Sequence, residues 1–224
     1  MRERGDLQVL HEPFMYLYYI DGDRDKFTGF APEADHPTSY EGIRDMIREK
    51  ASAGPVFFKD MGYYVFNTLG QDSEFASEMS HAFLIRDPAE SVISYAKRQS
   101  DFTCEEVGIE AQWQLYEALV GMGLTPTILM AHAIRRDPAA EMARYWTDAG
   151  LPDAPHALSW DASVPEGWRA VETWHQEVLQ TTAILPPDKG RDVAAELAAL
   201  GPPYADFVAH HRPFYDKFQA AHQK

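Results

Sequence analysis

The sequence has a single cysteine, few basic residues and no long hydrophobic segment. With Cys104 alone, no internal disulfide and no cysteine-rich metal site can form. No stretch approaches the ~18–20 continuous apolar residues of a membrane span. The first residues also lack the apolar core of a signal peptide. We therefore expect a cytoplasmic protein that binds no metal and no membrane.

Basic residues are scarce relative to acidic ones, 20 against 35, which gives a formal net charge of −15. This balance argues against a nucleic-acid partner, because such a partner needs a basic surface. It leaves room for an anionic cofactor, which needs only a few local cations and backbone N–H groups. The 224 residues, 45% of them hydrophobic, predict one domain, residues 1–224, with a full core.

Four short apolar runs predict buried strands, because they are rich in branched or aromatic residues and are separated by helix-like segments. This order of elements is typical of a parallel sheet covered by helices, so we predict a three-layer α/β/α fold. The runs are Leu7–Leu10, Pro55–Phe58, Ala82–Ile85 and Thr127–Met130.

Helix starts are marked by capping residues. Ser39 is expected to cap a helix after the first strand. Asp87-Pro88-Ala89-Glu90 combines an N-cap, a proline at the first helical position and a capping-box glutamate. Asp137–Glu141 repeats this pattern after the fourth strand. Longer helices are predicted over about 105–122 and from about 204 to the end.

The segment most informative about function joins the third strand to its helix. Arg86 ends the strand, Asp87-Pro88 opens the helix, and Ser94 follows eight residues after the arginine. Arginine can grip a phosphate through two parallel hydrogen bonds, and a serine hydroxyl can donate to the same group. In doubly wound sheets, ligands bind at the carboxyl ends of strands, where Arg86 is expected.

This segment resembles the sulfotransferase superfamily, in which an arginine and a serine at this spacing hold the 3′-phosphate of 3′-phosphoadenosine 5′-phosphosulfate (PAPS). The resemblance implies that role for Arg86 and Ser94, and PAPS as the co-substrate. The alternative is an arginine paired with a nearby carboxylate and a serine that merely lies on a helix.

Other segments resemble a group of bacterial sulfotransferase-like proteins. They are His11–Phe14 after the first strand, Phe57–Met61 at the end of the second, the stretch with Trp168, Trp174 and His175, and the tail with Tyr204 and Pro213–Tyr215. The resemblance covers nearly the whole chain, although only the segment with Arg86 and Ser94 is specific by itself.

Sulfotransferases usually begin with a strand and a loop of the type Pro-Arg-Ser-x-Ser-Thr, which holds the 5′-phosphosulfate. The 224 residues contain neither this loop nor a G-x-x-x-x-G-K-[ST] loop. Met1–Asp6 instead resembles the end of the following helix. We therefore expect a P-loop NTPase-like fold missing its first strand, through either a misassigned gene start or a real loss of the loop. Such a chain should transfer sulfate poorly.

Sulfuryl transfer needs a base for the acceptor's proton and positive charge for the leaving oxygen. Glu12 and His11 are the candidate bases, and Lys59 could contact the sulfate or the acceptor. For each, a structural role is an equal alternative: backbone bonding for Glu12 and His11, and a surface pair with Asp60 for Lys59. The aromatic residues near the amino terminus could build an acceptor pocket, although such residues more often fill the core. They are Phe14, Tyr16, Tyr18 and Tyr19.

The sequence thus predicts transfer of a sulfuryl group from PAPS to a hydroxyl or amine of a small metabolite. One alternative is a non-catalytic nucleotide-binding or interaction protein that kept the fold. Another is an ATP-dependent P-loop kinase relative, which the absence of a Walker-type lysine loop disfavours. The expected partner is a small-molecule acceptor rather than nucleic acid or a membrane, and a homodimer is an open option.

Overall fold

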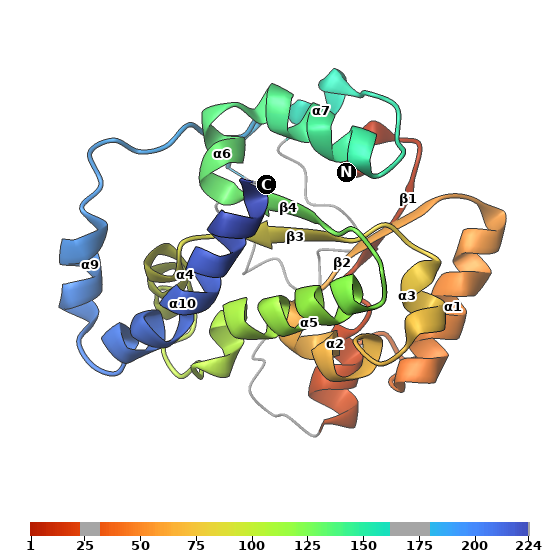
Figure 1. Ribbon diagram of the computed structural model, residues 1–224, viewed down its shortest axis with the longest axis horizontal. Helices are drawn as coiled ribbons and strands as arrows, with labels where there is room; N and C mark the ends of the chain where they lie inside the picture. Colours follow the sequence, from red (N-terminus) through yellow and green to blue (C-terminus); the bar gives the residue numbers. More distant parts are fainter. Residues whose placement is uncertain (23–31, 162–179, 224) are drawn as a thin grey trace. The chain divides into compact units, whose positions relative to one another are not determined.

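A computed structural model describes residues 1–22, 32–161 and 180–223 of the chain. It divides into two compact units, Met1–Thr68 with Ala154–Ile184, and Leu69–Asp153 with Leu185–Lys224. Each unit contains its own pair of parallel strands (Figure 1). The predictions for Trp168, Trp174 and His175 fall outside the described residues.

The first unit is built on strands β1 (Gln8–His11) and β2 (Val56–Lys59). They pair in parallel, with Gln8 opposite Val56 and His11 opposite Lys59. Between them lies helix α1 (Tyr40–Ala53), where the Ser39 hydroxyl accepts a hydrogen bond from the Gly42 N–H, at 3.1 Å, as its cap. The carboxyl ends of β1 and β2 therefore lie side by side.

Short helices complete the first unit. A π-helical turn, η2 (Leu17–Asp21), follows β1, and α2 (Gly62–Leu69) follows β2. Two 3₁₀ turns, η1 (Arg2–Arg4) and η4 (Pro155–Leu158), contact each other.

Aromatic side chains form the core of this unit. Phe14 is fully buried and its ring lies 5.5 Å from that of Tyr40. Tyr18 packs against Tyr63 and Tyr64, with ring centroids about 5 Å apart, and all three are buried. These aromatic residues fill the core, the more common of the two roles expected for the aromatic residues near the amino terminus.

The second unit is built on β3 (Ala82–Ile85) and β4 (Thr127–Met130), again paired in parallel. Three helices lie between them in the chain: α4 (Pro88–Ala96), η3 (Glu105–Val107) and α5 (Ile109–Gly121). The helix predicted over about 105–122 is therefore interrupted. The break is at Gly108, whose φ of 81° is readily adopted by glycine and ends the 3₁₀ turn before α5 begins.

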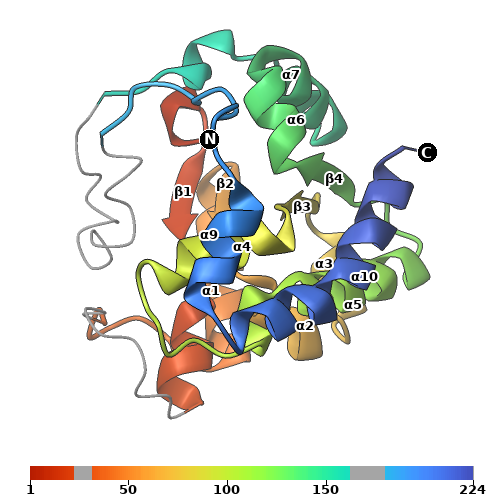
Figure 2. The same cartoon turned by 90° about the vertical axis from the view of Figure 1, so that its left-hand side faces the viewer.

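The second unit also contains the helices α3 (Ser73–Ser77), α6 (Ala131–Arg136), α7 (Pro138–Asp148), α9 (Val193–Leu200) and α10 (Tyr204–His222). Both views show α7 on one side of β4 and α5 on the other (Figures 1 and 2). Phe218 of α10 is fully buried and packs near Phe83 of β3, at a ring distance of 5.9 Å.

The α/β class predicted from the sequence is confirmed. Each of the four strands lies within one residue of its predicted apolar run, and both strand pairs are parallel. The long C-terminal helix is confirmed as α10. Among the residues that the structure describes, no helix has the length and apolar character needed to cross a membrane.

Candidate functional site

Glu12 and Lys59 meet at the carboxyl ends of β1 and β2. The Lys59 ammonium donates a hydrogen bond to Glu12 Oε1, and the Glu12 N–H donates to the Lys59 carbonyl at 3.0 Å. The Tyr64 hydroxyl lies 3.5 Å from the other carboxylate oxygen. Only 13% of the Glu12 side chain is exposed, against 53% of Lys59. Lys59 thus pairs with Glu12 rather than with Asp60, the partner in the alternative structural role.

The backbone of Glu12 is strained. Of the described residues other than glycine, Glu12 alone has a positive φ, 43°. This left-handed region is sparsely populated by residues with a side chain, and such positions cluster at functional sites. The conformation lets the chain leave β1 and turn at once into Pro13 and Phe14.

His11 is half-buried beside this pair. Burial lowers the pKa of its imidazole; the Glu12 carboxylate opposes this shift and the Lys59 ammonium adds to it. The imidazole is therefore neutral at physiological pH and able to accept a proton. Both predicted base candidates are thus held at one strand end together with Lys59.

Asp60 is a member of this cluster that the sequence did not mark as functional. Its Oδ1 accepts a hydrogen bond from the Phe14 N–H at 3.0 Å. Its Oδ2 is buried and accepts no hydrogen bond from any described residue. Burial raises the pKa of this carboxyl well above its usual value, the charge of Glu12 adds to the rise, and Lys59 opposes it. The only available sequence signal was its position next to Lys59.

In the second unit, Arg86 directly follows β3. Its Nε donates to Glu90 Oε2 at 3.1 Å. Arg86 therefore has the nearby carboxylate partner that it would also have in a purely structural role. The two terminal nitrogens make no hydrogen bond to a described residue, and 38% of the side chain is exposed. Those nitrogens carry four N–H donors in a planar fork suited to a phosphate.

Asp87 caps α4 as predicted, since its Oδ1 accepts a hydrogen bond from the Ala89 N–H at 2.8 Å. Its other oxygen accepts from Arg212 of α10, also at 2.8 Å. Glu90 does not return the second bond of a capping box, because its carboxylate is turned toward Arg86. The turn is therefore held by its cap and by α10.

Ser94 lies one helical turn beyond Glu90 on α4, so the two share a face of the helix. Arg98 donates to the Ser94 hydroxyl oxygen at 2.7 Å and to its carbonyl at 2.9 Å. A hydroxyl that accepts from a guanidinium keeps its own proton for donation to a ligand. Arg86, Glu90, Ser94 and Arg98 follow one another at steps of four; we call them the α4 row. Arg98 was not predicted as a site residue, although its spacing of four residues from Ser94 is visible in the sequence.

Two other polar groups of this unit lie away from the α4 row. Arg191, in the segment Lys189-Gly190-Arg191, pairs with Glu196 at 2.7 Å, and Lys97 reaches the same carboxylate at 3.1 Å. The bond from Arg191 is the main cause that lowers the pKa of Glu196 to about 2. His132, which follows β4, is exposed on α6.

Two histidines of α10 lie close to the single cysteine. Ligand atoms of Cys104, His210 and His211 lie within 4.8 Å of one another. His211, however, uses both ring nitrogens for the backbone: Nε2 lies 2.7 Å from the Cys104 carbonyl, and Nδ1 accepts from the Glu110 N–H at 3.3 Å. Burial also raises the pKa of the Cys104 thiol. These contacts make His211 a structural link between α10 and the start of α5.

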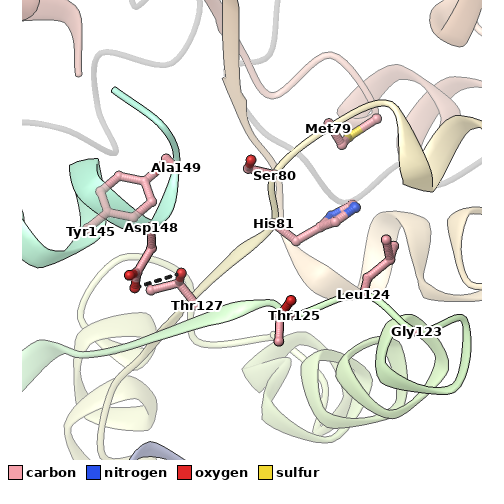
Figure 3. Close-up of a pocket in the computed structure, with 10 residues that line it drawn as sticks. All are labelled: Met79, Ser80, His81, Gly123, Leu124, Thr125, Thr127, Tyr145, Asp148 and Ala149. Atoms are coloured by element: carbon pink, nitrogen blue, oxygen red, sulfur yellow. Dashed lines mark hydrogen bonds between the residues drawn. The ribbon is translucent and has the colours of Figure 1, made fainter. Parts of the chain in front are cut away.

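A cavity of about 230 Å³ lies at the amino ends of β3 and β4 (Figure 3). His81, Tyr145 and Asp148 are among its lining residues, and Thr127 donates to Asp148 at 3.1 Å. It lies at the ends of the strands opposite to Arg86. Ligands of open α/β sheets bind at the carboxyl ends, so this cavity is not the expected site.

Both units thus place charged side chains at the carboxyl ends of parallel strands, the ends at which ligands of open α/β sheets bind. A sequence model of the family described as "Sulfotransferase domain" matches residues 1–220. The chain therefore belongs to the sulfotransferase domain family.

Two curated relatives come from Arabidopsis thaliana. The chain is 29% identical over 202 residues to the "Branched-chain-amino-acid aminotransferase-like protein 2" and 26% identical over 195 residues to the "Branched-chain-amino-acid aminotransferase-like protein 1". Each match covers 84% of this chain but only 33% and 34% of the relatives, so the chain spans about a third of their length. No solved structure gives a significant match.

Proposed function

We propose that this chain is part of an enzyme that transfers a sulfuryl group from PAPS to a hydroxyl or amine of a small-molecule acceptor, and that the 224 residues alone transfer it poorly, because they contain no loop for the 5′-phosphosulfate. The observation that carries the proposal is the α4 row, which begins directly at the end of β3. PAPS carries a 3′-phosphate, which ATP lacks, and this phosphate is the group that the row would bind. We also propose that the four strands belong to a single three-layer P-loop NTPase-like domain, because the chain belongs to the sulfotransferase domain family.

On the donor side, the terminal nitrogens of Arg86 would bind the 3′-phosphate, and the Ser94 hydroxyl would add a hydrogen bond. Arg98 supplies a second positive charge and orients that hydroxyl. Glu90 opposes phosphate binding by the row, because its carboxylate competes with the phosphate for Arg86. Binding would therefore replace a half-exposed ion pair with a charge-assisted phosphate contact.

On the acceptor side, Glu12 would take the proton of the attacking hydroxyl or amine while that atom bonds to sulfur. The bond from sulfur to the phosphate oxygen would break, and adenosine 3′,5′-bisphosphate would leave. Lys59 would neutralise charge on the transferring group, as cations do in phosphoryl transfer. Neutral His11 is the second candidate for the base.

Calorimetric titration with adenosine 3′,5′-bisphosphate, with AMP as control, tests the donor assignment. Hydrogen bonds to a charged group contribute about 1.5–3 kcal/mol, so the bisphosphate should bind at least about tenfold more tightly than AMP. Equal affinities would show that no 3′-phosphate site exists. Binding without transfer to any acceptor would favour the non-catalytic nucleotide-binding alternative.

A further inference from the structure

The turn that presents Glu12 is attached to the end of β2 through its backbone. Of its three residues, Pro13 has no N–H, which leaves those of Glu12 and Phe14. The Glu12 N–H donates to the Lys59 carbonyl and the Phe14 N–H to the Asp60 carboxyl, both at 3.0 Å. Every N–H donor of the turn is therefore satisfied by two consecutive residues of the neighbouring chain segment.

Strain in this turn requires such support. The left-handed conformation of a non-glycine residue costs about as much free energy as one hydrogen bond contributes. It persists only where the surrounding structure holds it. Glu12 has this conformation, and the Met15 N–H donates to its carbonyl at 3.0 Å. Asp60 is the one side chain that binds an N–H of the turn among the described contacts.

We propose that Asp60 is a positioning residue, whose buried carboxyl holds the Glu12–Phe14 turn so that the Glu12 carboxylate faces Lys59. The geometry of the turn stands by itself, whereas its importance for catalysis rests on the proposed function. Asp60 acts through Glu12 and touches no reacting atom.

The protonation of Asp60 fits this role. Glu12 and Lys59 are the charged groups that act on it, and Glu12 is already paired with the lysine. Burial disfavours a charged carboxyl at Asp60 and raises its pKa well above the usual value, so a neutral side chain is favoured at this position. Asparagine, a neutral residue with a carbonyl at the same position, should therefore replace Asp60.

Amide hydrogen exchange of the 224-residue chain tests the proposal without any nucleotide. In Asp60→Ala, the Phe14 and Glu12 amides should both exchange at least about tenfold faster, because the whole turn loosens. Asp60→Asn should keep both rates within about threefold of wild type. Asp72→Ala is the matched control: it removes another 3.0 Å hydrogen bond, which the Phe75 N–H in α3 donates to the Asp72 carboxylate.

A Glu12 amide that keeps its protection in Asp60→Ala would overturn the proposal, because Asp60 would then bind Phe14 without fixing Glu12. Equal disruption by asparagine and alanine would also overturn it. Glu12→Gly supplies a second test, since glycine tolerates the positive φ without support. In that background Asp60→Ala should shift the denaturation midpoint less than in wild type, and an equal shift would contradict the proposal. Neither measurement depends on the calorimetric result for the donor.

Discussion

The second unit contains two turns of identical sequence, Arg86-Asp87-Pro88-Ala89 and Arg136-Asp137-Pro138-Ala139. In both, the aspartate caps the next helix: Asp87 accepts from Ala89 at 2.8 Å, and Asp137 from Ala140 at 3.1 Å. The difference lies before the turn. Arg86 follows the last residue of β3, whereas α6 separates β4 from Asp137, and Arg136 is the last residue of that helix.

The comparison shows that capping chemistry alone does not make a ligand site. Asp-Pro starts a helix equally well in both places, because the cap needs only a local N–H. Only the first turn places its arginine at the carboxyl end of a strand and is also bound to α10, through Arg212. What distinguishes Arg86 is therefore its position in the fold rather than its neighbours in the sequence.

The largest expected difference between the turns is in nucleotide binding. Arg86→Ala should weaken the affinity for adenosine 3′,5′-bisphosphate by roughly 1.5–3 kcal/mol, or about 10- to 150-fold, since a charged hydrogen-bond partner is lost. Arg136→Ala, at an exposed position, should leave the affinity unchanged. Calorimetry measures both, and equal affinities for the two variants would remove Arg86 from the site.

A smaller difference is expected in stability. Asp87→Ala should lower the free energy of unfolding by about 1–2 kcal/mol, because both the cap and the half-exposed pair with Arg212 are lost. Asp137→Ala loses the cap alone, and should cost about 1 kcal/mol or less. Urea denaturation compares them, and a larger loss for Asp137→Ala would show that α10 does not support the first turn.

Glu90→Gln should change binding in the opposite direction. It removes the carboxylate that competes with phosphate for Arg86, and an exposed ion pair contributes only about 0.2–1 kcal/mol. We expect a two- to fivefold gain in affinity for the bisphosphate, by the same calorimetry. Glu141→Gln, next to the second turn, is the control. Weaker binding by Glu90→Gln would mean that Glu90 serves the site.

The pH dependence of stability tests the link that His211 makes between α10 and the start of α5. Burial lowers the pKa of His211, so below about pH 6.5 the unfolded chain binds more protons than the folded one. The free energy of unfolding should therefore fall as the pH falls from about 6.5. His81, whose pKa is lowered in the same way, contributes with the same sign.

His211→Gln should make this decline shallower than in wild type. Urea denaturation between about pH 5 and pH 7.5 measures the slopes. An unchanged slope in His211→Gln would contradict a neutral, buried His211.

Much of the fold could be predicted from the sequence because its signals are local. Short apolar runs located the four strands, and Ser39, Asp87 and Asp137 located three helix starts. The break at Gly108 was missed because a helical pattern continues on both sides of it. Helix α6 was missed because no cap precedes it.

The candidate site was predicted less completely, because part of it depends on pairing between strands. Arg86 and Ser94 follow from the order of residues within one segment. Glu12 meets Lys59 only through the parallel register of β1 and β2, and the burial of Asp60 depends on the turn that covers it. Neither could be read from the neighbours of these residues in the sequence.

The most direct test of the central claim is ³¹P NMR of adenosine 3′,5′-bisphosphate with the 224-residue chain. The account predicts that wild type and Arg136→Ala shift or broaden the resonance of the 3′-phosphorus, and that Arg86→Ala does not. An unperturbed 3′-resonance with wild type, or the same perturbation with Arg86→Ala, would contradict the assignment of the α4 row as the 3′-phosphate site.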